Sequence, residues 1–160
     1  MDASRLLPPM LIAATMVAIA ALSAGLGEAW LVPSLGSAVF AQALGPEQPS
    51  AQPYTIGVGQ LLGVAAGMAG VFLAGAGHAP AFMGEHVAWV RVAAVGIAMP
   101  LAAAAQMLAQ ARTPVGGATA LVVALGAETA SWGGAGRLVV GIALVTAIGE
   151  GVRRAVLRAR

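Results

Sequence analysis

The sequence predicts an all-α membrane protein in which four full transmembrane helices are combined with two short half-helices. Hydrophobic residues make up 59% of the 160-residue chain and charged residues only 9%, whereas soluble domains carry about 25% charge. Ala and Gly supply much of the apolar content and aromatic residues only 4%, so the helices are expected to pack closely through small side chains. This composition excludes a water-soluble globule and favours a single membrane domain over residues 1–160.

Four apolar runs are long enough to cross a bilayer, which requires about 20 residues of helix. The first run ends in a stretch of small residues that also resembles a signal-peptidase site, so a cleaved signal is the alternative to an uncleaved first helix. Polar loops at residues 45–53 and 78–86, and a third around Glu128 and Trp132, separate the later segments. The predicted spans cover residues 6–26, 54–75, 87–111 and 137–152.

Two further apolar segments are too short or too interrupted to be ordinary spans. Residues 31–44 contain Pro33 and Gly36, and residues 113–127 begin with Pro114. About ten helical residues rise roughly 15 Å, so each segment predicts a half-helix. The order long, short, long occurs twice, which predicts two internal repeats over about residues 6–76 and 87–155. Interrupted segments at matching positions indicate a transporter's binding site.

The charges favour a membrane orientation over a nucleic-acid-binding function. The chain has no Lys, and four of its eight Arg lie in the last eight residues without interleaved aromatic residues that could stack on bases. By the positive-inside rule we expect a bacterial inner-membrane protein with both termini in the cytoplasm. The chain has no Cys, and its two His, His78 and His86, share one loop, so no metal or cofactor is expected.

The two breaks predict a site for a small anion. Each break exposes the N-terminus of a short helix within the membrane, where free N–H groups and the helix dipole attract negative charge. The alternative is that the glycines only permit close packing and the hydroxyls bond to their own helices. The residues expected to contact the solute at the two breaks are Ser34, Gly36, Ser37, Gly116, Gly117 and Thr119.

Amide side chains within the spans are expected to point inward, because an unpaired polar group in lipid is costly. Gln106 and Gln110 are four residues apart on the third predicted span and lead toward Thr113, and Gln60 lies on the second span. We expect Gln106 and Gln110 either to line a pore or to form interhelical hydrogen bonds. Gln60 and Thr113 are expected to contact the solute. Arg91 is expected to snorkel to the interface.

The motifs at the breaks resemble the HPP family of small membrane proteins. Pro114-Val115-Gly116-Gly117-Ala118-Thr119-Ala120-Leu121 is similar to the family signature His-Pro-Pro-Ala-Gly-Ala-Thr-Ala-Leu, and residues 34–39 and 49–53 resemble two further marker segments in the same order. The resemblance implies a compact, usually four-spanning bundle, and plastid and cyanobacterial members are associated with nitrite transport. The name-giving His of the family corresponds here to Thr113, and its second Pro to Val115. An Arg and a further His of the family correspond to Tyr54 and Gln60, so residues that carry or share positive charge in the family are neutral here.

The leading hypothesis is therefore a transporter or channel for a small inorganic solute, with an anion favoured. The alternative is a non-transporting anchor, sensor or complex subunit. An enzyme is not expected, because no Gly-x-Ser-x-Gly elbow or catalytic cluster is found. Besides the solute and the lipid bilayer, a homo-oligomer is expected, with Gly59, Gly63 and Gly67 as a possible contact face. Whether the short segments re-enter or cross the membrane stays open.

Overall fold

The computed structural model describes residues 3–26, 33–82 and 87–159, which form helices and connecting turns. Four of the described helices are long and apolar enough to cross a membrane, and two are shorter, which confirms the predicted all-α fold. The elements are α1 (Ala3–Leu26), α2 (Pro33–Leu44), α3 (Pro53–Ala74), α4 (Trp89–Leu108), α5 (Pro114–Ala124) and α6 (Trp132–Arg158), with 3-10 turns η1 (Pro49–Ala51) and η2 (Ala76–His78).

Proline and glycine determine several of the helix ends. Helices α2, α3 and α5 begin at Pro33, Pro53 and Pro114, a position where the missing N–H group removes no helical hydrogen bond. Helix α3 ends before Gly75, which has a left-handed backbone with a φ angle of 68° and so suits a residue without a Cβ atom. The interruptions recognised in the sequence are therefore real helix boundaries.

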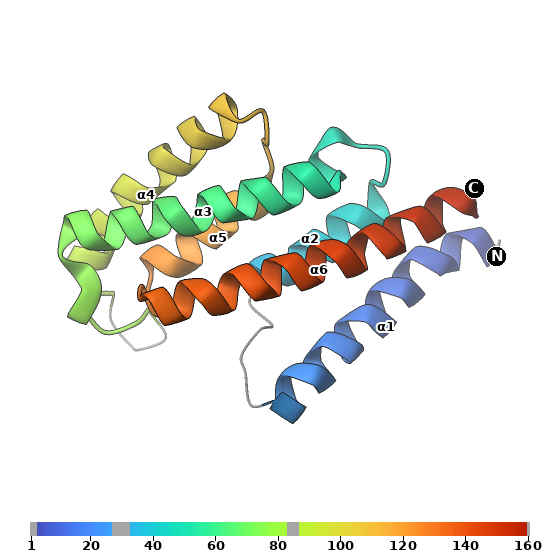
Figure 1. Ribbon diagram of the computed structural model, residues 1–160, viewed down its shortest axis with the longest axis horizontal. Helices are drawn as coiled ribbons and strands as arrows, with labels where there is room; N and C mark the ends of the chain where they lie inside the picture. Colours follow the sequence, from blue (N-terminus) through green and yellow to red (C-terminus); the bar gives the residue numbers. More distant parts are fainter. Residues whose placement is uncertain (1–2, 27–32, 83–86, 160) are drawn as a thin grey trace.

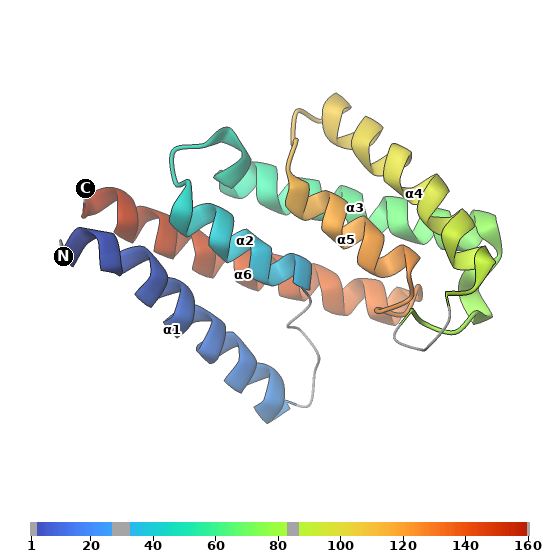
Figure 2. The same cartoon turned by 180° about the vertical axis from the view of Figure 1, so that it is seen from behind.

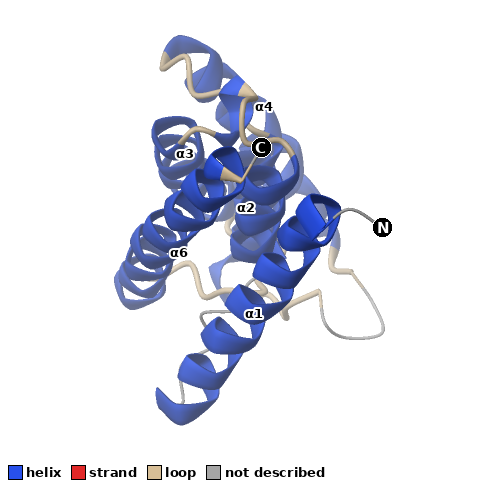
Figure 3. Ribbon diagram, turned by 90° about the vertical axis from the view of Figure 1, so that its right-hand side faces the viewer, coloured by secondary structure: helices blue, strands red, loops and turns tan. Residues whose placement is uncertain are grey.

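The two short helices pack on long helices from the other half of the chain. Helix α2 packs on α6, and α5 packs on α3. Helix α4 covers α3 and α5, whereas α1 touches α2 and α6 and diverges from the rest of the bundle (Figures 1 and 3). The two halves are thus interlocked, and α1 is the element least embedded in the bundle.

Helices α2 and α5 both begin near the middle of the long axis of the molecule and run toward opposite ends (Figures 1 and 2). They contact one another, and Val39 of α2, Val115 of α5 and Val145 of α6 belong to one buried apolar cluster. The short helices therefore start inside the bundle, as the sequence predicts, and apolar side chains fill the space where they meet the long helices.

Hydrogen bonds at the two ends of the bundle show how the second short segment runs. The hydroxyl of Tyr54 donates to the carbonyl of Ala109 at 3.1 Å, so the end of α4 lies beside the start of α3. Arg91, near the start of α4, donates to the carbonyl of Ala124 at 3.4 Å, so α5 ends beside the start of α4. The segment from residue 109 to residue 124 therefore passes from one end of the bundle to the other.

Helix α6 is longer at its start than the sequence predicts. The predicted span begins at Arg137 and leaves Trp132 and two glycines in a loop, but the helix begins at Trp132. The hydroxyl of Ser131 accepts a hydrogen bond from the N–H of Gly134 at 3.1 Å, and a Cβ atom at Gly134 would overlap the carbonyl of Thr129. Capping and close packing thus hold a glycine-rich turn that intrinsic helix propensity disfavours.

The arginine-rich end continues α6 as regular helix to Arg158, beyond residue 152, where the predicted span ends. Glu150 accepts hydrogen bonds from Arg153 and Arg154 at 2.6 Å each, at the i,i+3 and i,i+4 spacing that brings side chains together on a helix. Arg153 also donates to the carbonyl of Pro46 at 3.0 Å, so the end of α6 is tied to the turn that follows α2.

Candidate functional site

The start of α5 is held in the interior by side chains from its own leader and from α4. The backbone N–H of Thr113 donates to the Oε1 atom of Gln106 at 2.9 Å, and the hydroxyl of Thr113 accepts from the N–H of Val115 at 3.4 Å. Thr113, Val115 and Gln106 are all buried. The protein itself thus satisfies part of the hydrogen-bonding capacity at this helix start.

Glycines bring the backbone of α5 directly against that of α3. A Cβ atom at Gly63 would overlap the carbonyl oxygen of Gly116, and one at Gly116 would overlap the carbonyl oxygen of Gly59. At Gly67 an added Cβ atom would lie 2.7 Å from the Cβ atom of Val123. The face formed by Gly59, Gly63 and Gly67 is therefore used within the chain, so the suggestion that it forms an oligomer contact is wrong.

The hydroxyl of Thr119, a predicted solute ligand, bonds within its own helix. It donates to the carbonyl of Val115 at 3.0 Å, and the residue is fully buried. Gly117, in contrast, lies at the edge of the bundle and is partly buried. At the second break, the structure thus places Thr119 in the interior and Gly117 near the outer face of α5.

At the first break, the partly buried Gly36 lies against α1. A Cβ atom added there would be 3.0 Å from the terminal methyl group of Met16. Ser37 is also partly buried. Ser34 lies in the first turn of α2, and its side chain is outside the part of the chain that the structure describes.

Gln60 occupies the interior of the bundle without a hydrogen-bond partner. It is fully buried, and neither its Nε2 nor its Oε1 atom bonds to another group of the protein. It lies between Gly59 and Gly63, the two residues of α3 against which α5 begins. Burying an amide without partners costs about 1–3 kcal/mol by protein mutational data, so this side chain calls for a polar partner that the protein does not supply.

Gln42 of α2 is a second amide of the same kind, which the sequence analysis did not select. It is fully buried and both polar atoms of its amide lack partners. The amide packs against Gly149 of α6, where any Cβ atom would overlap Oε1. The signal for it was present, because Gln42 is a polar residue within an apolar short helix.

The structure separates two amides that the sequence analysis expected on one helical face. Helix α4 ends at Leu108, before Gln110, which is exposed and has a φ angle of 52°. Gln106 is buried and holds the start of α5, as described above. The helix must end early because the following leader turns inward to bring Thr113 against Gly59, so the pairing of Gln106 with Gln110 is wrong.

Four cavities lined by described residues bear on the expected site at the starts of the two short helices. One cavity of about 410 Å³ lies at the outer side of the α5 start and is lined by Gln106, Thr113 and Gly117, but its walls come from α4 and α5. Three others lie elsewhere, and none of the four combines residues of α2 with residues of α5. Val39 of α2 and Val115 of α5 belong to one buried apolar cluster.

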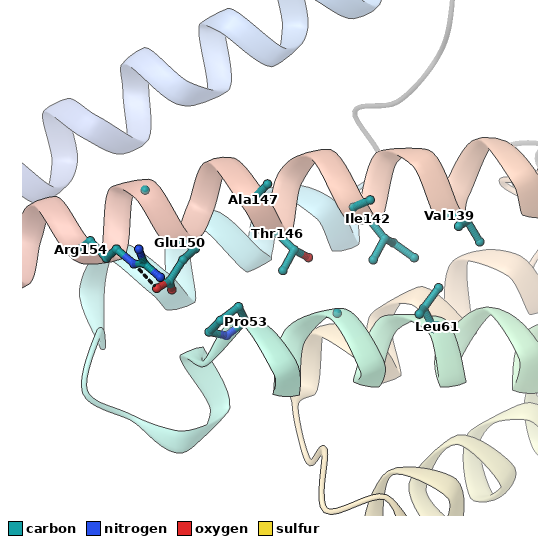
Figure 4. A pocket seen from close by; sticks show the side chains of 11 residues that line it. Pro53, Leu61, Val139, Ile142, Thr146, Ala147, Glu150 and Arg154 are labelled. Atoms are coloured by element: carbon teal, nitrogen blue, oxygen red, sulfur yellow. Dashed lines mark hydrogen bonds and ion pairs between the residues drawn. The ribbon is translucent and has the colours of Figure 1, made fainter.

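A groove of about 570 Å³ runs between α3 and α6 (Figure 4). Its walls are mostly apolar, and Thr146 points from α6 toward α3, where its buried hydroxyl has no hydrogen-bond partner. The ion pair of Glu150 with Arg154 lies at one end. In the part of the chain that the structure describes, no group of three His, Asp or Glu side chains could hold a metal ion.

Comparison with known proteins agrees with the helical pattern. A family model described as HPP, transmembrane region, matches residues 4–158. No curated protein and no solved structure matches the chain. The match spans nearly the whole chain and includes all four helices that could cross a membrane, so this chain is an integral membrane protein and belongs to the HPP family.

Proposed function

We propose that this protein carries a small inorganic solute, with a small anion favoured, through the centre of its helix bundle. The observation that carries the proposal is the pair of fully buried glutamines, Gln42 and Gln60, whose four amide polar atoms have no partner in the protein. Both border the same apolar cluster, because Val39 and Ala43 flank Gln42, and Ile56 and Val64 lie one turn to either side of Gln60.

Unpaired interior amides are expected where a polar species binds during a transport cycle. In a bilayer, every polar group of the unfilled interior is destabilising, and polar residues inside the membrane commonly mark a solute pathway. A solute or water that bonds to these amides relieves that cost. The closed packing around Val39 and Val115 corresponds in this proposal to a state in which the pathway is shut.

The preference for an anion rests on the positions of the short helices. Both begin inside the bundle, so the positive ends of their dipoles lie within the membrane. The amide groups of Gln42 and Gln60 add uncharged donors. A site built from dipoles and amides suits a monovalent anion, and the family resemblance names nitrite as the first candidate, although the basic residues of the family motif are absent here.

We further propose that residues 6–76 and 87–155 are inverted repeats. Helices α1 and α3 run in one direction along the bundle, whereas α4 and α6 run in the other (Figure 2), and the short helices exchange partners between the halves. Rocking of one repeat against the other is the usual basis of alternating access. The arginine-rich end of α6 supports a cytoplasmic position for both termini in a bacterial inner membrane.

The proposal is tested by flux into proteoliposomes. The wild-type protein should carry at least one of nitrite, nitrate, chloride and formate. The Gln60→Leu substitution, which removes the interior amide at nearly constant volume, should lower that flux at least about tenfold, equivalent to about 1.4 kcal/mol in the barrier. The matched control is Gln52→Leu, because Gln52 is an exposed glutamine just before α3.

Two results would contradict the proposal. The first is the absence of flux for every solute tested although the protein is folded and reconstituted. The second is equal flux in the wild type and the Gln60→Leu variant, because a pathway through the bundle centre must pass this side chain.

A second candidate function is a non-transporting subunit that binds another membrane protein. The groove between α3 and α6 favours it, because several of its lining residues have small side chains and let a helix approach closely. These residues are Gly57, Ala143, Ala147 and Gly151. Co-purification of one stoichiometric partner, together with absent flux, would favour this function over transport.

A further inference from the structure

Arg91, near the start of α4, does not snorkel to the surface as the sequence predicts. Its residue is only 5% exposed. The guanidinium donates to three carbonyls, at 2.6 Å to Ala79, 3.3 Å to Pro80 and 3.4 Å to Ala124. The chain after η2 and the end of α5 thus fold over this side chain and hold it inside the protein.

The positive charge of Arg91 has no anionic partner among the described residues. Its three acceptors are neutral carbonyls, and the one at the end of α5 adds only the partial negative charge of a helix C-terminus. Glu128, which lines the same pocket, pairs with Arg137 at 3.3 Å. A buried cation without a full counter-charge is costly, so the guanidinium of Arg91 favours an anionic partner.

The guanidinium lines a pocket of about 670 Å³ together with His78, Thr129 and Ser131. Residues from η2 and from the loop between α5 and α6 line the pocket, and these segments lie at the end of the bundle opposite the chain termini (Figure 1). The exposed Trp89 and Trp132 begin α4 and α6 at this same end. Because Trp concentrates at membrane–water interfaces, the pocket is expected at an interface, within reach of solutes.

Gly126 provides the space for the guanidinium beside this pocket. Its φ angle is 80°, and an added Cβ atom would lie 2.6 Å from the central carbon of the Arg91 guanidinium. A guanidinium has five N–H donors, and three hydrogen bonds to carbonyls leave further donors on Nη1 and Nη2. The arrangement therefore holds a planar cation in one orientation at the pocket wall.

We propose that this pocket binds a small inorganic anion at Arg91. The guanidinium supplies charge and hydrogen bonds in a planar fork that matches an oxyanion, and the hydroxyls of Thr129 and Ser131 lie in the same pocket. The site is at the end of the bundle and does not include the interior amides of Gln42 and Gln60. Anion binding here is therefore independent of whether the protein transports a solute.

The test is thermal unfolding of the purified protein in an uncharged detergent. Sodium gluconate, whose anion is bulky, is replaced by sodium nitrite, nitrate or chloride at constant ionic strength. Ligand binding to the folded state raises stability in a saturable, concentration-dependent way. We expect at least one small anion to raise the melting temperature of the wild type in this way.

Substitutions at Arg91 identify the site. Arg91→Gln should abolish the anion-dependent rise, and Arg91→Lys, which keeps the charge but loses the fork, should require roughly tenfold more anion for the same rise. The control is Arg158→Gln, an equal change in charge at the exposed far end of α6, which should respond as the wild type does. If Arg91→Gln does not fold, the wild type and Arg91→Lys still decide the question.

Three outcomes would overturn the inference. One is the absence of any saturable rise in the wild type, and another is the same anion dependence in an Arg91 variant as in the wild type. The third is stabilisation of the wild type by short-chain phosphatidylglycerol but not by free anions, which would assign the pocket to a lipid headgroup. None of these measurements uses vesicles, so a failure of transport and a failure of anion binding are seen separately.

Discussion

The packing of α5 on α3 and the packing of α2 on α6 occupy corresponding places in the two halves of the chain but differ in kind. Between α3 and α5, glycines bring the two backbones into direct contact at Gly63 and Gly116. Between α2 and α6, Gly149 makes room for the amide of Gln42, which has no hydrogen-bond partner. One contact is closed by backbone atoms, and the other contains an unpaired polar group.

This difference indicates which of the two helix contacts is the more rigid. Lipid tails are as apolar as side chains, so van der Waals contact between backbones contributes much of helix association in a membrane. The contact of α3 with α5, covered by α4, has that property. Helix α1 covers the other contact less closely, with only 17% of its most apolar stretch buried. The contact of α2 with α6 is therefore the less tightly covered of the two.

The largest effect is expected for Gly63→Val, which tests the contact of α3 with α5. The new side chain has no space, because even a Cβ atom would overlap the carbonyl of Gly116. Overpacking typically costs about 1–3 kcal/mol and more where backbone atoms must separate, so we expect little folded protein by size-exclusion chromatography and thermal unfolding. Gly96→Val on the exposed face of α4, where nothing lies within 4 Å of a Cβ atom, is the control. Equal stability of the two variants would show that α3 and α5 are not held by this contact.

An opposite and smaller effect is expected for Gln42→Met, which tests the contact of α2 with α6. The substitution replaces an unpaired amide with an apolar chain of similar size, so stability should rise by about 1–3 kcal/mol in thermal unfolding. Flux in proteoliposomes should fall at the same time if the amide serves the solute. A loss of stability would mean that Gln42 already has a partner, such as an ordered water molecule. The α2–α6 and α3–α5 contacts would then differ less in polarity than their protein atoms indicate.

The smallest effect on stability is expected for substitutions at the N-terminal caps of α5 and α6. Thr113→Val keeps the shape that packs on Gly59 but removes the hydroxyl that accepts from Val115, and Ser131→Ala removes the acceptor for Gly134. Loss of a cap costs about 1 kcal/mol. Because Gln106 still holds the backbone N–H of Thr113, thermal unfolding should show no larger loss for Thr113→Val than for Ser131→Ala. A much larger loss at Thr113 would assign that residue a role beyond capping.

Hydropathy, prolines and small residues in the sequence were sufficient to predict the helical membrane fold and the two short helices. These features are local, because a bilayer requires a minimum length of apolar helix and proline ends a helix wherever it occurs. The predicted importance of Gln60 has the same origin, since an amide in an apolar span must face the interior.

Tertiary structure alone decided which partner each of these elements meets. The glycine face of α3 contacts α5 and not a second chain, and α4 ends before Gln110. Arg91 is buried under carbonyls of the preceding loop and of the end of α5. The tertiary structure also placed Gln42 against Gly149, which lies more than a hundred positions away in the sequence. The physical reason is that small, nearly uniform apolar side chains specify that helices pack closely but carry little information on which surfaces meet. That choice depends on the shape of the whole bundle.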